Sequence, residues 1–163
     1  MINYSMDKLI ATEFRCDSTT WDTSKIWEYL KTDVVKFKYN PPVFVEPLSY
    51  EEKAAVSRII ENMLIRFPMP CIYLSERIVD DRIIYECVDG FKRLTALWSC
   101  MQNDFKFIHM KYFPEFNGLT YKEIGRPFQR RIEQYFWSVN ILSCQMSEEA
   151  KVDAIRRIEG IEL

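Results

Sequence analysis

The sequence predicts an α+β domain in which short, mixed strands are interleaved with helices. Apolar residues recur at helical spacing along residues 49–66, and short runs rich in β-branched and aromatic residues follow at 71–74 and 83–88. A length of 163 residues is that of one domain. We therefore expect residues 1–163 to fold around a single core.

The first quarter of the chain predicts one helix and one strand. Residues 1–20 are mixed in polarity and indicate strand or loop. Residues 24–31 predict a short helix, because their apolar side chains fall on one face. Residues 34–37 predict a strand, which Pro41 and Pro42 end because proline cannot donate to a strand ladder.

The longest predicted helix covers residues 49–66. Ser49 and Glu52 have the spacing of a capping box, in which each side chain bonds the other residue's backbone N–H. Pro68 and Pro70 end the helix. One face carries the expected buried stripe, which consists of Val56, Ile59, Ile60, Met63 and Leu64.

A hairpin and another helix follow. Strands are predicted at 71–74 and 83–88, and a polar turn at 78–82 joins them. The second strand breaks at Asp89-Gly90, and residues 91–101 predict a helix.

The next segment predicts a strand, a turn and a helix. Residues 105–110 are strand-like, and Asn117-Gly118 is a strong turn signal. Thr120 and Glu123 have the spacing of a second capping box, ahead of a helix that Pro127 begins and that runs to about residue 134.

The end of the chain predicts a strand and a helix. Residues 136–145 form an apolar run typical of a strand. Ser147 is the expected N-cap of the last helix, whose apolar face carries Val152, Ile155 and Ile158.

The balance of charged residues indicates which kinds of partner the chain can bind. Lys and Arg total 22, Asp and Glu total 24, and the formal net charge is −2. A chain that grips DNA alone usually has a basic surplus, because phosphate neutralisation supplies most non-specific affinity. We therefore expect no tight DNA binding by this chain alone. Arg126, Arg130 and Arg131 form either a local basic face or an ordinary solvated helix surface.

Cysteine, histidine and hydropathy patterns indicate a cytoplasmic protein without a metal site or a membrane partner. The five cysteines have no CxxC spacing, and His109 is the single histidine. His109 lies in an apolar run, which favours a core or edge histidine over a general base. The N-terminus lacks the pattern of a signal peptide, and no apolar run approaches the roughly 18 residues of a membrane span.

The junction at residues 88–95 has the clearest chemical character. A strand ends, Gly90 permits a tight turn, and a helix begins, so free backbone N–H groups can bind an anion. Arg93 lies in the first turn and can offer a bidentate fork to phosphate oxygens, while Asp89 can face a ribose or a phosphate-bound metal ion. The alternative is that Asp89 is a plain N-cap and Arg93 is solvated.

Residues 88–97, Val-Asp-Gly-Phe-Lys-Arg-Leu-Thr-Ala-Leu, resemble the Asp-Gly-Gln-Gln-Arg-Leu-Thr signature of the N-terminal domain of GmrSD-type restriction systems. That family belongs to the ParB/sulfiredoxin-like superfamily. The resemblance covers about residues 34–159, and besides the signature it includes 57–61, 67–74, 111–120, 129–132 and 139–142.

The resemblance implies a ParB/sulfiredoxin-like fold and nucleotide chemistry. Family members serve in modification-dependent restriction and related phage defence, and the signature turn is where the family binds or hydrolyses nucleoside triphosphates. The implied ligand is a nucleoside triphosphate with Mg²⁺. Carried over to this chain, the binding residues are Asp89, Gly90, Phe91, Lys92 and Arg93, with Asp89 and Arg93 as the catalytic pair.

Departures from the family pattern predict weak or lost NTPase activity. The family carries a Gln-Arg pair in a segment that corresponds to residues 41–49, where neither residue is present. Its Arg-Leu-Asn-x-Gly-Gly stretch is reduced to residues 157–160, and no nuclease domain is expected within 163 residues.

The alternative function is that of a non-catalytic interaction protein, a phage-encoded regulator or counter-defence decoy that keeps the fold and binds a protein partner or a second copy of itself. A sulfiredoxin-like reductase ranks third, because that chemistry needs a cysteine inside the turn, where Phe91 and Lys92 stand.

Overall fold

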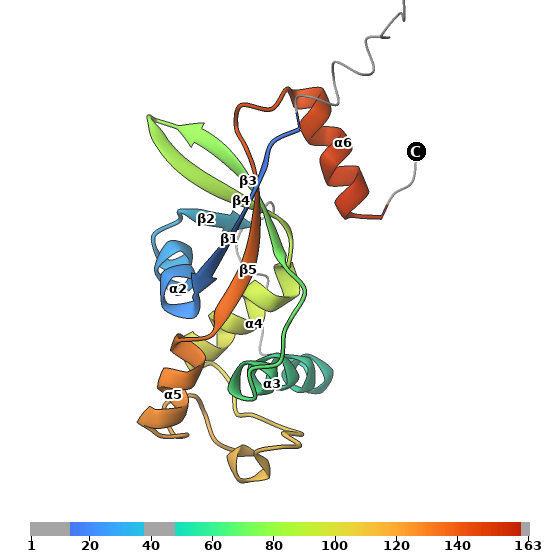
Figure 1. The fold of residues 1–163 in the computed structure, drawn as a ribbon. Helices are drawn as coiled ribbons and strands as arrows, with labels where there is room; N and C mark the ends of the chain where they lie inside the picture. Colours follow the sequence, from blue (N-terminus) through green and yellow to red (C-terminus); the bar gives the residue numbers. More distant parts are fainter. Residues whose placement is uncertain (1–13, 38–47, 161–163) are drawn as a thin grey trace, which may run out of the picture.

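The structure, a computed structural model, describes residues 14–37 and 48–160. Within these ranges the chain forms a mixed five-stranded sheet and five α-helices (Figure 1). The prediction of an α+β fold with short mixed strands among helices is confirmed at this level.

The elements follow one another in an irregular alternation. Their bounds are β1 Cys16–Asp22, α2 Thr23–Lys31, β2 Val35–Phe37, α3 Tyr50–Leu64, β3 Ile72–Val79, β4 Arg82–Asp89, α4 Phe91–Gln102, the 3₁₀ helix η1 Pro114–Phe116, α5 Arg126–Glu133, β5 Phe136–Leu142 and α6 Glu148–Ile158.

The sheet has the strand order β1-β5-β3-β4-β2. β1 pairs with β5 and β3 pairs with β4 in antiparallel fashion, whereas β3–β5 and β4–β2 are parallel pairs. The register of β3 on β4 shifts between Tyr73 and Leu74, so that Tyr73 lies opposite Asp89. The shift falls directly before the turn at which β4 ends.

The two faces of the sheet pack against different helices. Trp137 and Val139 of β5 belong to the main core, which also takes the buried side chains of α2, α3, α4 and α5. Leu142, at the end of the same strand, belongs to a second cluster with Ala150 and Ala154 of α6. Figure 1 shows α6 set apart from the other four helices, at the opposite end of β5 from α5.

Two helices have the N-terminal caps that the sequence predicts. The Ser49 hydroxyl accepts from the Glu52 backbone N–H at 3.2 Å, and a Glu52 carboxylate oxygen accepts from the Ser49 N–H at 2.7 Å. The Ser147 side chain accepts from the Ala150 N–H at the start of α6. Both predicted N-termini are therefore confirmed.

The polar turn expected at 78–82 is wrong, because both strands of the hairpin are longer than predicted. β3 runs to Val79 and β4 begins at Arg82, which leaves only Asp80 and Asp81 in the turn. Both aspartates have positive φ angles, 50° and 59°. A two-residue turn of this kind matches the twist of the flanking strands, and aspartate tolerates its left-handed backbone.

The strand expected at 105–110 is absent from the described structure, and the expectation that His109 is a core or edge histidine of that strand is wrong. Phe107 exchanges backbone hydrogen bonds with Gly118 and Leu119 across a loop. His109 has a φ angle of 56°, is exposed, and is hydrogen-bonded to the Tyr50 hydroxyl. Burial of Phe105 and Phe107 explains the apolar pattern without a strand.

Other boundaries also differ from prediction. β5 ends at Leu142, so 143–145 is not strand. Glu123 bonds the Thr120 N–H and hydroxyl within a turn, whereas α5 begins later, after the uncapped Gly125. Val152 is exposed, because α6 packs through Ala150 and Ala154 instead.

Candidate functional site

The turn between β4 and α4 has a backbone that only glycine adopts without strain. Gly90 is the N-cap of α4 and has a φ angle of 105°. A Cβ at this position would lie 3.0 and 3.2 Å from two side-chain carbons of Ile72, which belongs to the core beneath the turn. Gly90 therefore serves both the conformation of the turn and its close approach to β3.

The first turn of α4 has no side-chain cap, and within the part of the chain that the structure describes no carboxylate or hydroxyl accepts from its N–H groups. Asp89 is not the N-cap of this helix, and the plain N-cap interpretation of Asp89 is wrong. α4 is 12 residues long, and its dipole adds positive potential at this end.

Arg93 points back over the turn and holds it to Cys71, the residue before β3. One terminal guanidinium nitrogen lies 3.1 Å from the Cys71 carbonyl oxygen and 3.3 Å from a carboxylate oxygen of Asp89. The Arg93 side chain is only 16% exposed, against 52% for Asp89. Its Nε is buried and has no hydrogen-bond partner among the described residues. Arg93 is therefore a clamp for the turn, and the solvated interpretation is wrong.

A chain of polar contacts continues from Arg93 across the sheet. The Asn140 side-chain amide of β5 donates to the Cys71 sulfur at 3.3 Å, and the Ser18 hydroxyl of β1 donates to the Asn140 side-chain oxygen at 2.6 Å. Hydrogen bonding between the Tyr73 hydroxyl and Cys71 raises the pKa of Tyr73. These contacts link Arg93 and the turn to residues of β5 and β1, which are far from the turn in the sequence.

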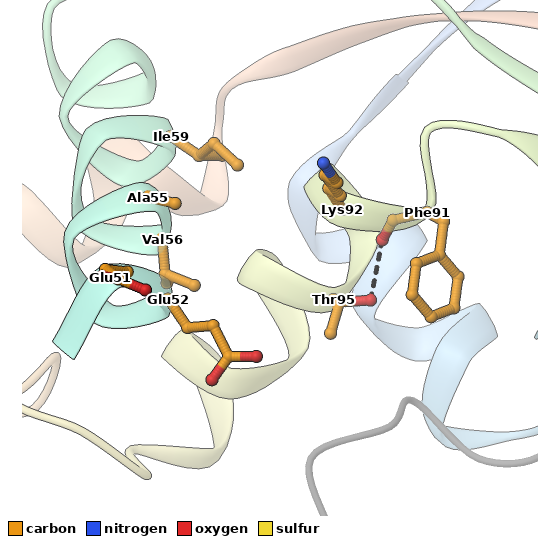
Figure 2. Close-up of a pocket in the computed structure, with 8 residues that line it drawn as sticks. All are labelled: Glu51, Glu52, Ala55, Val56, Ile59, Phe91, Lys92 and Thr95. Carbon is orange, nitrogen blue, oxygen red and sulfur yellow. Dashed lines mark hydrogen bonds between the residues drawn. The ribbon is translucent and has the colours of Figure 1, made fainter. Parts of the chain in front are cut away.

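On its other side, the turn borders a pocket of about 470 Å³ between α3 and α4 (Figure 2). This volume is within the usual range for small-molecule sites. α4 contributes Phe91, Lys92 and Thr95 to the wall. The wall from α3 consists of Glu51, Glu52, Ala55, Val56 and Ile59.

The pocket has an apolar middle and charged ends. Ala55, Val56 and Ile59 form the apolar wall opposite Phe91, whose ring is 40% exposed and packs edge-on with Phe37 at 5.2 Å. Figure 2 shows the Lys92 amino group and the Glu52 carboxylate at different ends of the pocket. The Thr95 hydroxyl donates to the Phe91 carbonyl oxygen at 2.7 Å.

The turn thus divides the five predicted site residues between two surfaces. Phe91 and Lys92 face the pocket, while Asp89 and Arg93 interact with each other beside Cys71, and Gly90 joins the two pairs. Sequence reasoning missed the whole α3 wall, because Glu52 was explained by its cap and Val56 and Ile59 by the core stripe. Part of that stripe in fact borders the pocket, since Ile59 is only half-buried.

Burial controls the cysteines of this region. Burial, and less strongly the nearby Asp89 carboxylate, raises the pKa of Cys87 to about 12, although Arg93 acts in the opposite direction. Complete burial raises the pKa of Cys100 in α4 as well. Both thiols are neutral near pH 7. Within 14–37 and 48–160, no group of three or more His, Cys, Asp or Glu side chains is arranged to bind a metal ion.

Of the three arginines of α5, Arg126 and Arg131 make contacts within the fold, whereas Arg130 is exposed. Arg126 pairs with Glu133 at 2.6 Å, and the Arg131 Nε donates to the Leu64 carbonyl oxygen at the end of α3. The predicted loss of a Gln-Arg pair concerns residues 41–49, of which 41–47 lie outside the described residues.

Comparisons with known proteins return no match to a family model, to a curated protein or to a solved structure. Among the helices in the described ranges, none is long and apolar enough to span a membrane.

Proposed function

We propose that this chain is a nucleotide-binding module with a ParB/sulfiredoxin-like fold, related to the domains of modification-dependent restriction systems. The carrying observation is that a pocket of about 470 Å³ opens beside the uncapped N-terminus of α4, with Phe91 and Lys92 at the junction. In this proposal the phosphates lie against the first turn of α4 and the Lys92 amino group, and the base enters the apolar pocket.

The role proposed for Arg93 is mainly to hold the turn. Its guanidinium is engaged by the Cys71 carbonyl and by Asp89, so it keeps the α4 N–H groups in position and is not free to follow a transferring phosphoryl group. Lys92 is exposed and supplies a point charge without the fork of an arginine. This arrangement supports binding with slow or no hydrolysis.

Magnesium fits this proposal as a companion of the phosphates. Mg²⁺ keeps several waters and usually binds one or two carboxylates in addition to substrate phosphates. Asp89 is the carboxylate of the turn and is half exposed, so it can face such an ion while one oxygen remains near Arg93. When bound, the ion would neutralise phosphate charge.

A binding measurement tests the proposal. ATP, GTP, CTP and UTP, each with and without Mg²⁺, are titrated calorimetrically and in thermal-shift assays. We expect at least one to bind at submillimolar concentration. Lys92→Ala should weaken binding about tenfold or more, since it removes a charged contact, whereas Lys106→Ala, an exposed lysine outside the pocket, should leave it unchanged. Arg93→Ala should abolish binding. No shift with any nucleotide at millimolar concentration would contradict the proposal.

Phosphate release under Mg²⁺ tests the catalytic part. We expect turnover well below about 1 s⁻¹, the lower end of typical enzyme rates, and no cleavage of DNA. Faster hydrolysis that disappears in Arg93→Ala would show that Arg93 leaves Asp89 during the reaction and acts on the phosphates.

A second candidate, a non-catalytic interaction protein, is favoured by the tip of the β3–β4 hairpin. Ile78 and Ile83 lie opposite each other there and are 64% and 50% exposed. This candidate predicts concentration-dependent association of the chain, or binding of a defence protein, that Ile78→Thr with Ile83→Thr abolishes. Light scattering after gel filtration measures self-association. A monomer at all concentrations, with nucleotide binding intact, would favour the first candidate.

A further inference from the structure

We propose that the pocket between α3 and α4 selects guanine among the nucleobases, through the carboxylate of Glu52. This inference rests on the proposed function and adds the identity of the base. It depends on which polar groups line the pocket and on which of them remain free to bind.

The charged side chains that α3 contributes to the pocket are acceptors. Glu51 and Glu52 are carboxylates, which accept hydrogen bonds and donate none when ionised. The Thr95 hydroxyl already donates its proton to the Phe91 carbonyl oxygen at 2.7 Å, so it offers the pocket only lone pairs. Among the described residues that line this pocket, Lys92 is the one charged donor.

Glu52 retains bonding capacity after it has capped α3. One of its carboxylate oxygens accepts from the Ser49 N–H at 2.7 Å, and Ser49 holds the glutamate backbone in return. The capping box therefore fixes the rotamer of Glu52, and no other residue in 14–37 and 48–160 is hydrogen-bonded to its second oxygen. Figure 2 shows this side chain extending from α3 toward α4, across one end of the pocket.

The charges define a single orientation for the ligand. Phosphates are repelled by the two glutamates and attracted by Lys92 and by the start of α4. The base then lies between the Phe91 ring and the apolar wall, and its far edge faces Glu52. A planar aromatic ring is the chemical group that both surfaces favour.

Base chemistry determines which nucleotide fits this edge. Guanine presents two adjacent donors, the ring N1–H and the 2-amino group, and a carboxylate can accept from both. Adenine and cytosine each place a ring acceptor next to their amino group, so one lone pair would face the carboxylate. Uracil places a carbonyl oxygen on each side of its single N–H. Only guanine pairs its edge with Glu52 without opposing acceptors.

The experiment compares four nucleotides on two proteins. Calorimetric dissociation constants are measured for GTP, ITP, ATP and UTP with the wild-type chain. ITP lacks only the 2-amino group. We expect GTP to bind about tenfold or more tighter than ATP and UTP, because a hydrogen bond to a charged group is lost and an acceptor is opposed, with ITP between them.

Glu52→Gln is the decisive variant, and Glu51→Gln is its matched control. Glutamine also serves in capping boxes, so α3 keeps its N-cap. The side-chain NH2 group of glutamine, a donor, replaces the second carboxylate oxygen, an acceptor. We expect the GTP preference to fall to within about threefold of ATP in Glu52→Gln and to persist in Glu51→Gln, which changes the same charge on the same turn. Circular dichroism confirms that both variants are folded.

The outcomes separate this inference from the proposed function. If no nucleotide binds the wild-type chain, the proposed function fails and the base assignment falls with it. If all four bind equally, or if the preference is unchanged in Glu52→Gln, the base assignment is wrong and the proposed function stands. The comparison of GTP with ITP needs only the wild-type protein, so it decides the question even if a variant misfolds.

Discussion

Gly90 combines a left-handed backbone with a core neighbour that would have to shift to admit a Cβ. Its φ angle is 105°, and Ile72 lies 3.0 Å from the site of a Cβ. Gly118 has a similar φ angle of 88° but nothing within 4 Å of its Cβ site. A comparison of substitutions at the two glycines therefore distinguishes the energetic cost of backbone strain from that of steric contact.

Gly90→Ala should destabilise the protein more than Gly118→Ala. Left-handed backbone alone costs about 1–2 kcal/mol for a residue with a Cβ, which both variants pay. The contact with Ile72 should add about 1 kcal/mol or more at Gly90, because a packed core side chain must move. Urea unfolding monitored by fluorescence measures the difference. Equal losses in the two variants would show that Ile72 yields freely.

Cys87 and Cys100 should resist alkylation in the folded protein. With a pKa of about 12, Cys87 is ionised in about one molecule in 10⁴ at pH 8, and burial suppresses ionisation of Cys100 too. Cys16 is exposed and should react before both of them, although partial burial and the Asp17 carboxylate raise its pKa. A brief iodoacetamide pulse followed by mass spectrometry gives the order of labelling, and protein unfolded in urea provides the fully labelled control. Labelling of Cys100 as fast as Cys16 would contradict the buried core of α4.

The β3–β4 hairpin extends beyond the strands that flank it. β5 pairs with β3 only from Ile72 to Ser75, and β2 pairs with β4 only from Tyr85 to Cys87. The outer part is a two-stranded ribbon, which Figure 1 shows projecting from the sheet to the Asp80-Asp81 turn. Its stability depends largely on that turn and on cross-strand pairs.

Asp80→Asn combined with Asp81→Gly should stabilise the protein by about 0.5–1 kcal/mol. Both positions have positive φ, and Asn-Gly is the preferred pair for such two-residue turns. Replacing both aspartates by alanine removes the same charges without suiting the backbone, so that variant should be less stable than wild type. Thermal unfolding compares the three proteins. A gain in the alanine variant would mean that charge repulsion, and not backbone strain, limits the turn.

At the scale of the whole molecule, three arginines in and near α5 make contacts within the fold. Arg126 pairs with Glu133, and Arg131 and Arg66 donate to the carbonyl oxygens of Leu64 and Gln134. The net charge is −2. Neither the total charge nor this cluster favours a polyanion.

The isolated chain should therefore bind generic duplex DNA no more tightly than about 10⁻⁴–10⁻⁶ M, the usual range for non-specific contacts at physiological salt. Fluorescence polarisation with a labelled duplex, repeated at two salt concentrations, measures the affinity and its salt slope. Submicromolar binding at physiological salt would contradict this expectation and would indicate a local basic surface that the net charge of the chain does not show.

The sequence by itself determined the features that act over a few residues. The capping box of α3 and the cap of α6, the end of β4 at Asp89-Gly90, and the α+β class all follow from neighbouring side chains and backbone preferences. The same local reasoning wrongly predicted a strand at 105–110. A buried apolar loop and a strand have the same pattern of apolar residues, and only the pairing of Phe107 with Gly118 distinguishes them.

Only the tertiary structure decided what the turn between β4 and α4 contacts. Arg93 meets the Cys71 carbonyl 22 residues away, and Asn140 meets Cys71 across 69 residues. The packing of α3 against α4 turns Glu52 and Ile59 into walls of a pocket. Such contacts depend on strand order and helix packing, which no local preference encodes. They place Arg93 against Cys71 and Lys92 at the pocket, on different sides of the same turn.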